Sequence, residues 1–237
     1  MANRLTGWIK EQVTIANRTG VVLGLSGGLD SAVVAALCKR AFPDSTLAAI
    51  MPCHSSDIDV AHAGLLAERF DIQTEFIDLG MVFDYLLTVL PGTASNVESD
   101  KLAQANIKPR LRMTTLYYLA AQHDSLVIGT GNRSEISIGY FTKYGDGGAD
   151  IMPLGNLGKA QVRELARHMN VPREIIDKAP SGGLWEGQTD EREMGVTYEE
   201  LDRYLSTGEA RDEVKKRIDS LISGSTHKRA LPPIPPF

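Results

Sequence analysis

The sequence contains only two cysteines, Cys38 and Cys53, among its 237 residues. Two thiols are too few for a disulfide framework or a four-ligand zinc site, so we expect both to be reduced and the protein to be cytoplasmic. No apolar run approaches the roughly 18 residues that a membrane-spanning helix needs. The first residues also lack the apolar stretch and cleavage site of a secretory signal. These absences predict an intracellular protein without membrane contact.

Positive charge is also scarce, with 25 Lys and Arg against 30 Asp and Glu and a formal net charge of −5. Nonspecific nucleic acid binding depends on neutralising phosphates, so this balance argues against a nucleic acid partner. A local basic pocket remains compatible with it. The chain is 43% hydrophobic and 23% charged, which excludes a wholly disordered protein. Its length predicts a single domain spanning residues 1–237.

Short apolar runs alternate with amphipathic stretches in the first part of the chain. Buried strands are predicted over 21–25, 46–51, 73–77 and 126–128, and helices over 3–17, 30–41, 57–70, 79–90 and 98–122. Strands and helices that alternate at this spacing form βαβ units. The sequence therefore predicts an α/β fold with a doubly wound, mostly parallel sheet and helices on both faces.

The remainder of the chain has a different pattern. Residues 129–153 are rich in glycine and polar side chains, which is typical of a long functional loop. Helical spacing returns over 159–170, 197–206 and 211–222. Residues 182–195 are predicted to be a flexible loop. The proline-rich end is predicted to be extended or frayed.

A glycine-rich turn follows the first predicted strand, in the segment Val21–Ser31 (VVLGLSGGLDS). Glycines let the backbone approach a ligand closely, and the N–H groups at a helix N-terminus bind anions. Ser26 and Ser31 can add hydroxyl donors. A plain flexible turn is the competing interpretation, but the strand before it, the helix after it and the flanking serines favour a phosphate site.

The turn lacks the Gly-Lys-Ser/Thr sequence of a Walker loop and carries Asp30 at the helix start instead. A carboxylate beside phosphates is repelled unless a cation lies between them, and Mg²⁺ binds one or two carboxylates together with phosphate oxygens. Asp30 is therefore predicted to bind Mg²⁺, although a helix cap alone would also explain it. Glu135 is predicted as the second carboxylate, against the alternative of a solvated loop residue.

The SGGLDS turn in this setting resembles the phosphate loop of the N-type ATP pyrophosphatases. A more specific resemblance, to the ammonia-dependent NAD synthetases, runs through nearly the whole chain. It is carried, in order, by GLSGGLDSAV, NIKPRLRM, GTGNRSE, GYFTKYGDGGAD, LGKAQVRELA, APSGGLWEGQTDE, MGVTYEELDRYL and STHKR. Two positions depart from the family pattern: Pro109, which is expected to delay or bend its helix, and Ser181, which replaces a threonine and keeps the hydroxyl.

The resemblance implies roles for residues that match the family motifs. ATP contacts are implied for Gly24, Leu25, Ser26, Gly27, Gly28, Leu29, Asp30, Ser31, Thr130, Lys159 and Ser181. Contacts with the pyridine dinucleotide are implied for Arg110, Lys143, Asp150, His227 and Lys228. Mg²⁺ is implied at Asp30 and Glu135. Composition alone would make Lys159 a surface lysine and the residues near the end a frayed terminus.

The reaction that the resemblance implies is the amidation of nicotinic acid adenine dinucleotide (deamido-NAD) by ammonia. ATP is split into AMP and pyrophosphate by way of an acyl-adenylate, and NAD is the product. The substrate brings its own carboxylate, so no catalytic nucleophile is expected from the protein. The chain has no room for the amidase domain of glutamine-using relatives, so ammonia is expected as the nitrogen source.

The resemblance also implies a homodimer with the dinucleotide near the subunit interface. The apolar residues Leu86, Leu87, Leu111, Met113, Leu116 and Tyr117 are assigned to that interface, although they could equally be core. Two other functions are weighed. A tRNA-modifying enzyme would need a basic face or a CxxC pair, and the sequence has neither. A nucleotide-binding regulator without turnover is disfavoured by the retained Asp30, Glu135 and Lys159.

Overall fold

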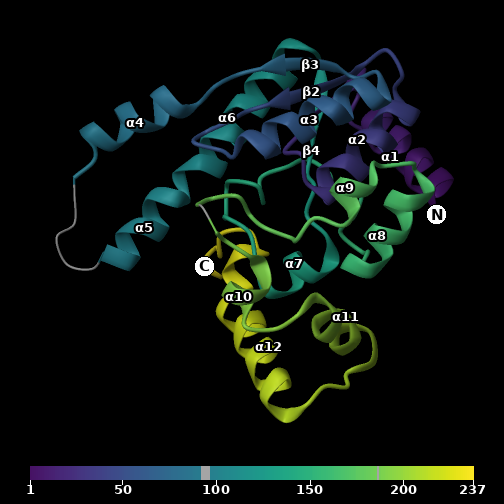
Figure 1. The fold of residues 1–237 in the computed structure, drawn as a ribbon. Coiled ribbons are helices and arrows are strands. Elements are labelled where there is room, and N and C mark those ends of the chain that lie inside the picture. Colours follow the sequence, from purple (N-terminus) through teal and green to yellow (C-terminus); the bar gives the residue numbers. More distant parts are fainter. Residues whose placement is uncertain (92–96, 186) are drawn as a thin grey trace.

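The computed structural model describes residues 1–91, 97–185 and 187–237. Within this part of the chain, four strands form one parallel sheet in the order β3-β2-β1-β4 (Figure 1). The strands are β1 (Gly20–Gly24), β2 (Thr46–Ile50), β3 (Gln73–Phe76) and β4 (Ser125–Ile128). The chain leaves β1 toward β2 on one side and reaches β4 on the other, so the loops after β1 and β4 meet at a topological switch point. The predicted α/β fold with a parallel sheet is confirmed.

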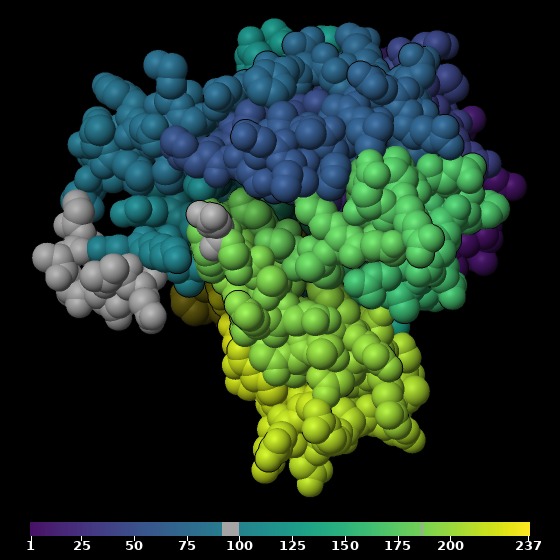
Figure 2. All heavy atoms as spheres, in the orientation of Figure 1, coloured from purple at the N-terminus to yellow at the C-terminus, as the bar shows by residue number. Residues whose placement is uncertain are grey.

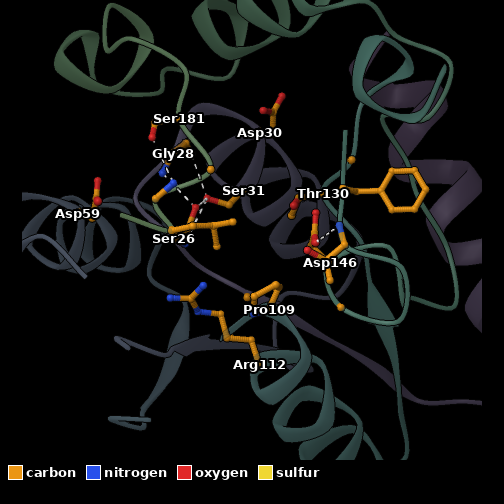
Figure 3. Close-up of a pocket in the computed structure, with 18 of the residues that line it drawn as sticks. Ser26, Gly28, Asp30, Ser31, Asp59, Pro109, Arg112, Thr130, Asp146 and Ser181 are labelled. Atoms are coloured by element: carbon orange, nitrogen blue, oxygen red, sulfur yellow. Dashed lines mark hydrogen bonds between the residues drawn. The ribbon is translucent and has the colours of Figure 1, made fainter. Parts of the chain in front are cut away.

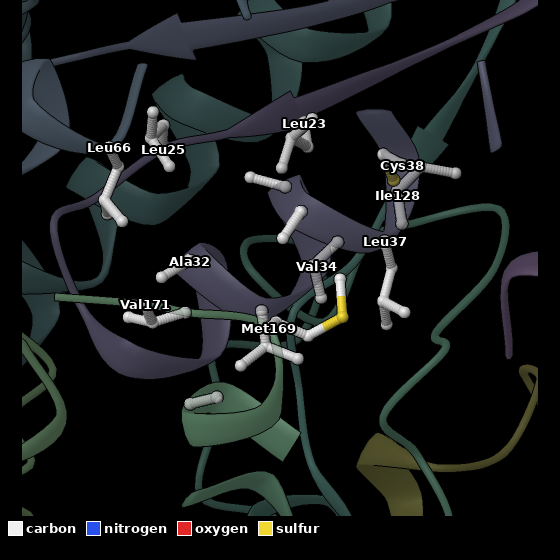
Figure 4. Packing of buried hydrophobic residues seen from close by; sticks show 14 of the residues in the cluster. Leu23, Leu25, Ala32, Val34, Leu37, Cys38, Leu66, Ile128, Met169 and Val171 are labelled. Atoms are coloured by element: carbon white, nitrogen blue, oxygen red, sulfur yellow. The ribbon is translucent and has the colours of Figure 1, made fainter. Parts of the chain in front are cut away.

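Helices cover both faces of this sheet. One face packs against α1 (Ala2–Ile15), α2 (Leu29–Ala41), α3 (Asp57–Phe70), α8 (Lys159–His168) and α9 (Arg173–Ile176), and the other against α4 (Gly80–Val89) and α6 (Ile107–Gln122). Side chains along a strand alternate between the faces, so Leu23 enters the first core and Val22 the second. Figure 4 shows the first core, where Leu23, Leu37 and Ile128 pack with Cys38.

A third apolar cluster lies away from the sheet. It joins α7 (Arg133–Ile138) to α10 (Asp190–Met194), α11 (Tyr198–Thr207) and α12 (Asp212–Gly224), through residues such as Ile138, Met194, Leu201 and Ile218. We call α10, α11 and α12 the helical lobe; it lies below the sheet in Figure 1 and forms the yellow-green projection in Figure 2. The lobe therefore has its own core and meets the rest of the protein at α7 and α8.

Several predicted elements need correction. The helix predicted over 98–122 is two helices, α5 (Val97–Ala105) and α6, because Pro109 has no N–H to donate to the carbonyl of Ala105. The loop predicted over 129–153 contains α7, and the loop predicted over 182–195 ends in α10, where Asp190 and Met194 are buried. The Pro91-Gly92 pair between the helices predicted over 79–90 and 98–122 is typical of a turn, and it falls partly outside the described residues.

The ends of the chain also differ from the expectation in detail. In the helix predicted over 3–17, the apolar residues at helical spacing include Trp8, Ile9 and Val13, and the structure buries Ile9 and Val13 but leaves Trp8 36% exposed. Near the other end, residues Thr226–Lys228 form a short 3-10 helix, η1, and the chain beyond Leu231 is exposed as predicted. Cys38 and Cys53 are both free and buried. Among the described helices, none is long and apolar enough to cross a membrane.

The six apolar residues assigned to a subunit interface are mostly used inside the subunit. Leu87, Leu111 and Leu116 pack against the second core, and Met113 lines a cavity, which favours the alternative that these four are core residues. Tyr117, also one of the six, is 37% exposed, and the other exposed apolar side chains described on α4, α5 and α6 include Met81, Val82, Tyr85, Val89, Leu102 and Tyr118. Helices α4 and α5 extend away from the sheet in Figure 1, and we call these two helices together with the neighbouring α6 the arm.

Candidate active site

The turn between β1 and α2 is held in shape by its two serines. The Ser31 hydroxyl donates to the carbonyl of Gly28 (2.9 Å) and lies 3.0 Å from the Ser26 hydroxyl. The backbone N–H of Gly28 donates to Ser26 Oγ (3.3 Å). No side chain caps the N-terminus of α2, whose N-cap is Gly28. The N–H groups of the helix start are thus free of side-chain partners, as an anion site requires.

Gly27 is fixed by both its backbone and its neighbours. Its φ is +74°, in the region that favours glycine, and an added Cβ would lie 2.2 Å from the carbonyl oxygen of Asp59 on α3. The glycine therefore lets the turn press directly against α3. Figure 3 shows the turn between Asp59 on one side and Thr130, which follows β4, on the other.

Lys159, the first residue of α8, lies between two acidic residues. Its ammonium pairs with Asp30 of α2 and lies 3.2 Å from Glu135 Oε1 of α7. Only 4% of the Lys159 side chain is exposed, and 16% of each carboxylate side chain. Three residues that are distant in sequence thus form one buried ion cluster next to the phosphate turn. Lys159 is therefore no surface lysine.

Charge in this cluster is unbalanced, because two carboxylates share one ammonium. Burial lowers the pKa of Lys159, but Asp30 and Glu135 outweigh burial and hold it above its usual value. Burial raises the pKa of Glu135 to about 7, even though the charge of Lys159 opposes this. A cation at this place would relieve the excess negative charge.

Glu135 is aimed at Lys159 by a capping box at the start of α7. The Glu135 N–H donates to Asn132 Oδ1 (3.0 Å), and the Asn132 N–H donates to Glu135 Oε2 (3.2 Å). Asn132 is fully buried, and its amide also lies 3.4 Å from Asp30 Oδ1. The capping box leaves Glu135 Oε1 for Lys159 and fixes both carboxylates relative to each other.

The predicted ATP residues come together around one cavity of about 970 Å³. Its lining includes the phosphate turn, Thr130, Lys159 and Ser181, together with Glu135. Gly27 supports the turn from behind, against α3. A cavity of this size is at the upper end of the range for small-molecule sites, so it has room for a nucleotide and part of a second substrate.

Most residues predicted to hold the dinucleotide form a second group beside this cavity. The Lys143 ammonium donates to the carbonyl of His227, and the guanidinium of Arg110 lies 3.4 Å from the carbonyl of Lys143. Lys228 lines the cavity and donates to the carbonyls of Gly139 and Phe141, at 2.8 Å each. The C-terminal basic residues are therefore docked onto the 139–143 segment, in contrast to a frayed terminus.

Asp150 is engaged within the protein. Its Oδ2 accepts from the backbone N–H of Val127 in β4 (2.7 Å), and its Oδ1 accepts from the Tyr117 hydroxyl (3.1 Å). These bonds place the carboxylate at the end of β4, on the side of α6. A role for Asp150 toward substrate stays a prediction.

The sequence analysis missed Arg112, which lines the cavity beside Pro109 (Figure 3). Arg112 Nε donates to the carbonyl of Met51 (3.1 Å) and its Nη2 to Ser55 Oγ (3.3 Å). Both partners are neutral, so the guanidinium keeps its charge for a ligand. Lys108 lies one helical turn earlier on α6 and donates to the carbonyl of Leu184 (2.9 Å). The spacing of four residues between Lys108 and Arg112 is a sequence signal that could have predicted one positively charged face of this helix.

Comparison with known proteins assigns this site to a family. The profile of the NAD synthase family matches residues 1–232. The chain belongs to the NAD synthase family. An NH(3)-dependent NAD(+) synthetase of Carboxydothermus hydrogenoformans is 50% identical over 232 residues, covering 98% of this chain and 95% of that protein. The predicted family, the ligase class and the function of ammonia-dependent NAD synthesis are thereby confirmed, and the tRNA-modifying alternative is removed.

Solved structures of the same family share the fold over the whole chain. An NMN synthetase from Francisella tularensis superposes with a TM-score of 0.93 at 40% identity, covering 100% of this chain and 97% of that one. An NH3-dependent NAD synthetase from Campylobacter jejuni superposes with a TM-score of 0.80 at 30% identity, covering 98% and 96%. The names of these two enzymes indicate different products, a mononucleotide and a dinucleotide.

Proposed function

We propose that this chain amidates deamido-NAD with ammonia and ATP, giving NAD, AMP and pyrophosphate. The observation that carries the proposal is the buried cluster of Lys159, Asp30 and Glu135 beside an uncapped helix N-terminus. This arrangement suits a polyphosphate bound together with a cation. Family membership supports the pyridine nucleotide as the second substrate.

The proposed reaction has two steps and needs no nucleophile from the protein. A carboxylate oxygen of the substrate attacks the α-phosphorus of ATP, and pyrophosphate leaves. Ammonia then attacks the carbonyl carbon of the acyl-adenylate, and AMP leaves with the oxygen that joined it to the acyl group. The N–H groups at the start of α2 and the Lys159 ammonium would stabilise the negative charge on the phosphates, because the N–H groups of Ser26 and Gly28 already donate to serine hydroxyls.

Asp30 and Glu135 fit a magnesium ion. Both carboxylates contact the Lys159 ammonium, so they lie close enough together to supply the one or two protein ligands that Mg²⁺ usually takes beside phosphate oxygens. The described residues hold no group of three His, Cys, Asp or Glu around a common point, so ATP would complete the coordination. When bound, Mg²⁺ would offset the phosphate charge. Partial rescue of a Glu135→Gln enzyme by raised Mg²⁺ tests this assignment; a loss of turnover that Mg²⁺ leaves unchanged contradicts it.

The pyridine substrate is proposed to bind where Lys228 meets the cavity, with Arg110, Lys143, Asp150 and His227 beside it. Three of these five side chains are cationic at neutral pH, which suits the phosphates of a nucleotide. They lie next to the nucleotide cavity, so the substrate's carboxylate end could reach the ATP side while its phosphates face the basic group. A cytoplasmic location, drawn from the two reduced thiols, stays a prediction.

A homodimer is proposed through the arm formed by α4, α5 and α6. The exposed apolar side chains of that arm, among them Met81 and Tyr85 at 85% and 71%, support a protein interface. A second copy is the partner that the family resemblance implies. Replacing Met81 and Tyr85 with Asp should convert the dimer to a monomer in sedimentation experiments, and a wild-type monomer would contradict the proposal.

The test of the proposed function is substrate-dependent release of AMP and pyrophosphate. Purified protein with ATP, Mg²⁺ and ammonium should release both only when deamido-NAD is added, and NAD should appear in equal amount. A regulator without turnover would release neither. Release that does not depend on the pyridine nucleotide would contradict the proposal.

Nicotinic acid mononucleotide is a second candidate substrate. This chain is more similar to the Francisella NMN synthetase (TM-score 0.93, 40% identity) than to the Campylobacter NAD synthetase (TM-score 0.80, 30% identity), and this difference favours the mononucleotide as a candidate. Both substrates carry the same pyridine carboxylate, and only the dinucleotide has an adenylate half. The ratio of kcat/KM for the two nucleotides decides between them.

A further inference from the structure

Helix α11 lies outside the sheet, yet it contacts α7 and α8, two of the three helices that carry the ion cluster. A capping box at its start fixes its first turn, because the Thr197 side chain accepts from the Glu200 N–H and Glu200 Oε2 accepts from the Thr197 N–H (3.1 Å). Tyr198 follows immediately and Asp202 lies one turn later, on the same side of the helix. The proposed function gives neither residue a role.

Tyr198 contacts two members of the ion cluster. Its hydroxyl lies 3.1 Å from Glu135 Oε1 and donates to Asp190 Oδ2 (2.8 Å). Its ring centroid lies 4.9 Å from the Lys159 ammonium, within the range of a cation–π contact. The residue is only 2% exposed. Tyr198 thus holds a carboxylate with its hydroxyl and an ammonium with its ring.

Asp202 contacts residues that are adjacent in sequence to Glu135 and Lys159. Its Oδ1 accepts from the Ser134 hydroxyl, and its Oδ2 accepts from the backbone N–H of Ala160 (3.0 Å). Ser134 is fully buried, and its Oγ in turn accepts from the backbone N–H of Lys159 (3.3 Å). Asp202 therefore ties the start of α8 to α7, and its charge lies at the N-terminus of α8, where a carboxylate is favourable.

Gly158 leaves room for this contact. A Cβ at Gly158 would lie 2.8 Å from the Asp202 carboxyl carbon and within 2.9 Å of both carboxyl oxygens. Its φ of −69° is open to any residue, so the backbone does not require a glycine here. The close approach of Asp202 does require one.

We propose that Tyr198 and Asp202 of α11 are positioning residues, which hold Glu135 and Lys159 at the separation that ATP and its metal need. This inference rests on the proposed function and assigns part of that function to the helical lobe. Because effective positioning depends on fractions of an ångström, a small displacement of Lys159 would slow the reaction while leaving the fold intact.

The alternative is that Tyr198 is only a core residue of the helical lobe. Conservative variants separate the two. Tyr198→Phe removes the hydroxyl but keeps the ring, and Asp202→Asn removes the charge but keeps the shape. Matched controls come from the pair Tyr204 and Asp219 in the same lobe, whose hydroxyl and carboxylate lie 2.6 Å apart at the surface. They are Tyr204→Phe and Asp219→Asn.

The measurements are kcat, KM for each substrate and the melting temperature of each full-length variant, all at a temperature where the variant is folded. We expect kcat to fall roughly tenfold or more in Tyr198→Phe and in Asp202→Asn, the size of effect given by one hydrogen bond to a charged group. KM for the pyridine nucleotide should stay within about twofold of wild type, since its proposed contacts are untouched. Both control variants should match wild type.

Two further variants address the mechanism. Gly158→Ala should lower kcat as Asp202→Asn does, whereas Gly64→Ala, at an open position of α3, should not. In a Glu135→Ala background the Tyr198 hydroxyl has lost its partner in the cluster. Tyr198→Phe should then reduce the residual rate less than twofold, because the effects of two mutations that remove the same contact are not additive.

The inference is overturned if Tyr198→Phe and Asp202→Asn keep the kcat of the two controls, or if their slower rates match a lower folded fraction. It is also overturned if the effects of Tyr198→Phe and Glu135→Ala multiply. The wild-type protein is assayed alongside. If wild type releases no AMP with either pyridine nucleotide, the proposed function fails, and this result differs from an active wild type with unaffected variants.

Discussion

Lys159 Nζ lies 3.2 Å from Glu135 Oε1, and the same ammonium pairs with Asp30, although α2, α7 and α8 are far apart in sequence. One buried cation thus joins the phosphate turn after β1 to the polar loop after β4. Removing it would leave two carboxylates facing each other without a counter-charge. The chemistry and the stability of the site therefore depend on the same residue.

Replacing Lys159 with Met should lower both activity and stability. We expect kcat/KM to fall about a hundredfold or more, as for loss of one preorganised charge. The free energy of unfolding should fall by about 3–5 kcal/mol, because a buried partner charge is left unpaired. Urea unfolding and steady-state kinetics measure the two effects. Arg173→Met, which breaks an exposed pair with Asp177, is the control and should change stability by less than about 1 kcal/mol.

The stability of the metal-free protein should depend on pH through Glu135. Burial raises the pKa of Glu135 from 4.5 to about 7, so the folded protein holds a proton that the unfolded chain releases between these values. Its contribution to stability is full below about 4.5 and is lost as pH rises through about 7. The stability of wild type relative to Glu135→Gln should therefore fall across this range. A difference that stays flat across this pH range would contradict it.

The basic residues near the C-terminus should affect one substrate only. His227→Ala with Lys228→Ala should raise KM for the deamidated nucleotide roughly tenfold, by loss of a charged contact. KM for ATP should change little, since the phosphate turn is a separate segment. Lys216→Ala, an exposed lysine of α12, serves as the control. Equal changes in both constants would show that loss of the Lys228 bonds to Gly139 and Phe141 disturbs the whole cavity.

Trp185 should report the binding of both substrates. The Lys101 ammonium lies 5.0 Å from the centroid of the Trp185 ring. The carbonyl of the preceding residue, Leu184, accepts a hydrogen bond from the Lys108 ammonium. Leu184 and Trp185 line the cavity. If the loop that carries them closed over the ligands, it would shield the acyl-adenylate from water. In a Trp8→Phe protein, whose remaining tryptophan is Trp185, emission should change when ATP and the deamidated nucleotide are added together. Identical spectra with and without ligands would argue against closure.

The sequence predicted the sheet and the phosphate turn because both depend on local patterns. Val21, Val22 and Leu23 form a continuous apolar run, and the serines and glycines follow it directly. The break at Asn106 was only partly visible, since the residues on both sides have helical spacing and Pro109 alone indicated a late start or a bend. Helix α7 had a readable signal, because Asn132 and Glu135 stand at N-cap and N3 spacing, but the glycines around it favoured a loop.

Local sequence patterns could not predict how the charged residues are arranged in the site. Lys159 was expected to contact ATP from the family resemblance, yet nothing near it in sequence shows that it is buried between Asp30 and Glu135. Tyr198 looked like one apolar residue of an amphipathic helix, and its hydroxyl contacts depend on how α11 packs on α7 and α8. Such contacts join residues through tertiary packing, so periodicity alone does not reveal them.

The transfer of one oxygen atom tests the central claim most directly. Deamido-NAD in which both oxygens of the nicotinate carboxylate are a heavy isotope is incubated with ATP, Mg²⁺, ammonium and the protein, and the AMP is analysed by mass spectrometry. The account predicts one heavy oxygen in the AMP for each NAD formed, because the carboxylate oxygen attacks the α-phosphorus and stays with it. AMP without the label would contradict an acyl-adenylate route, and no AMP at all would contradict the proposed function.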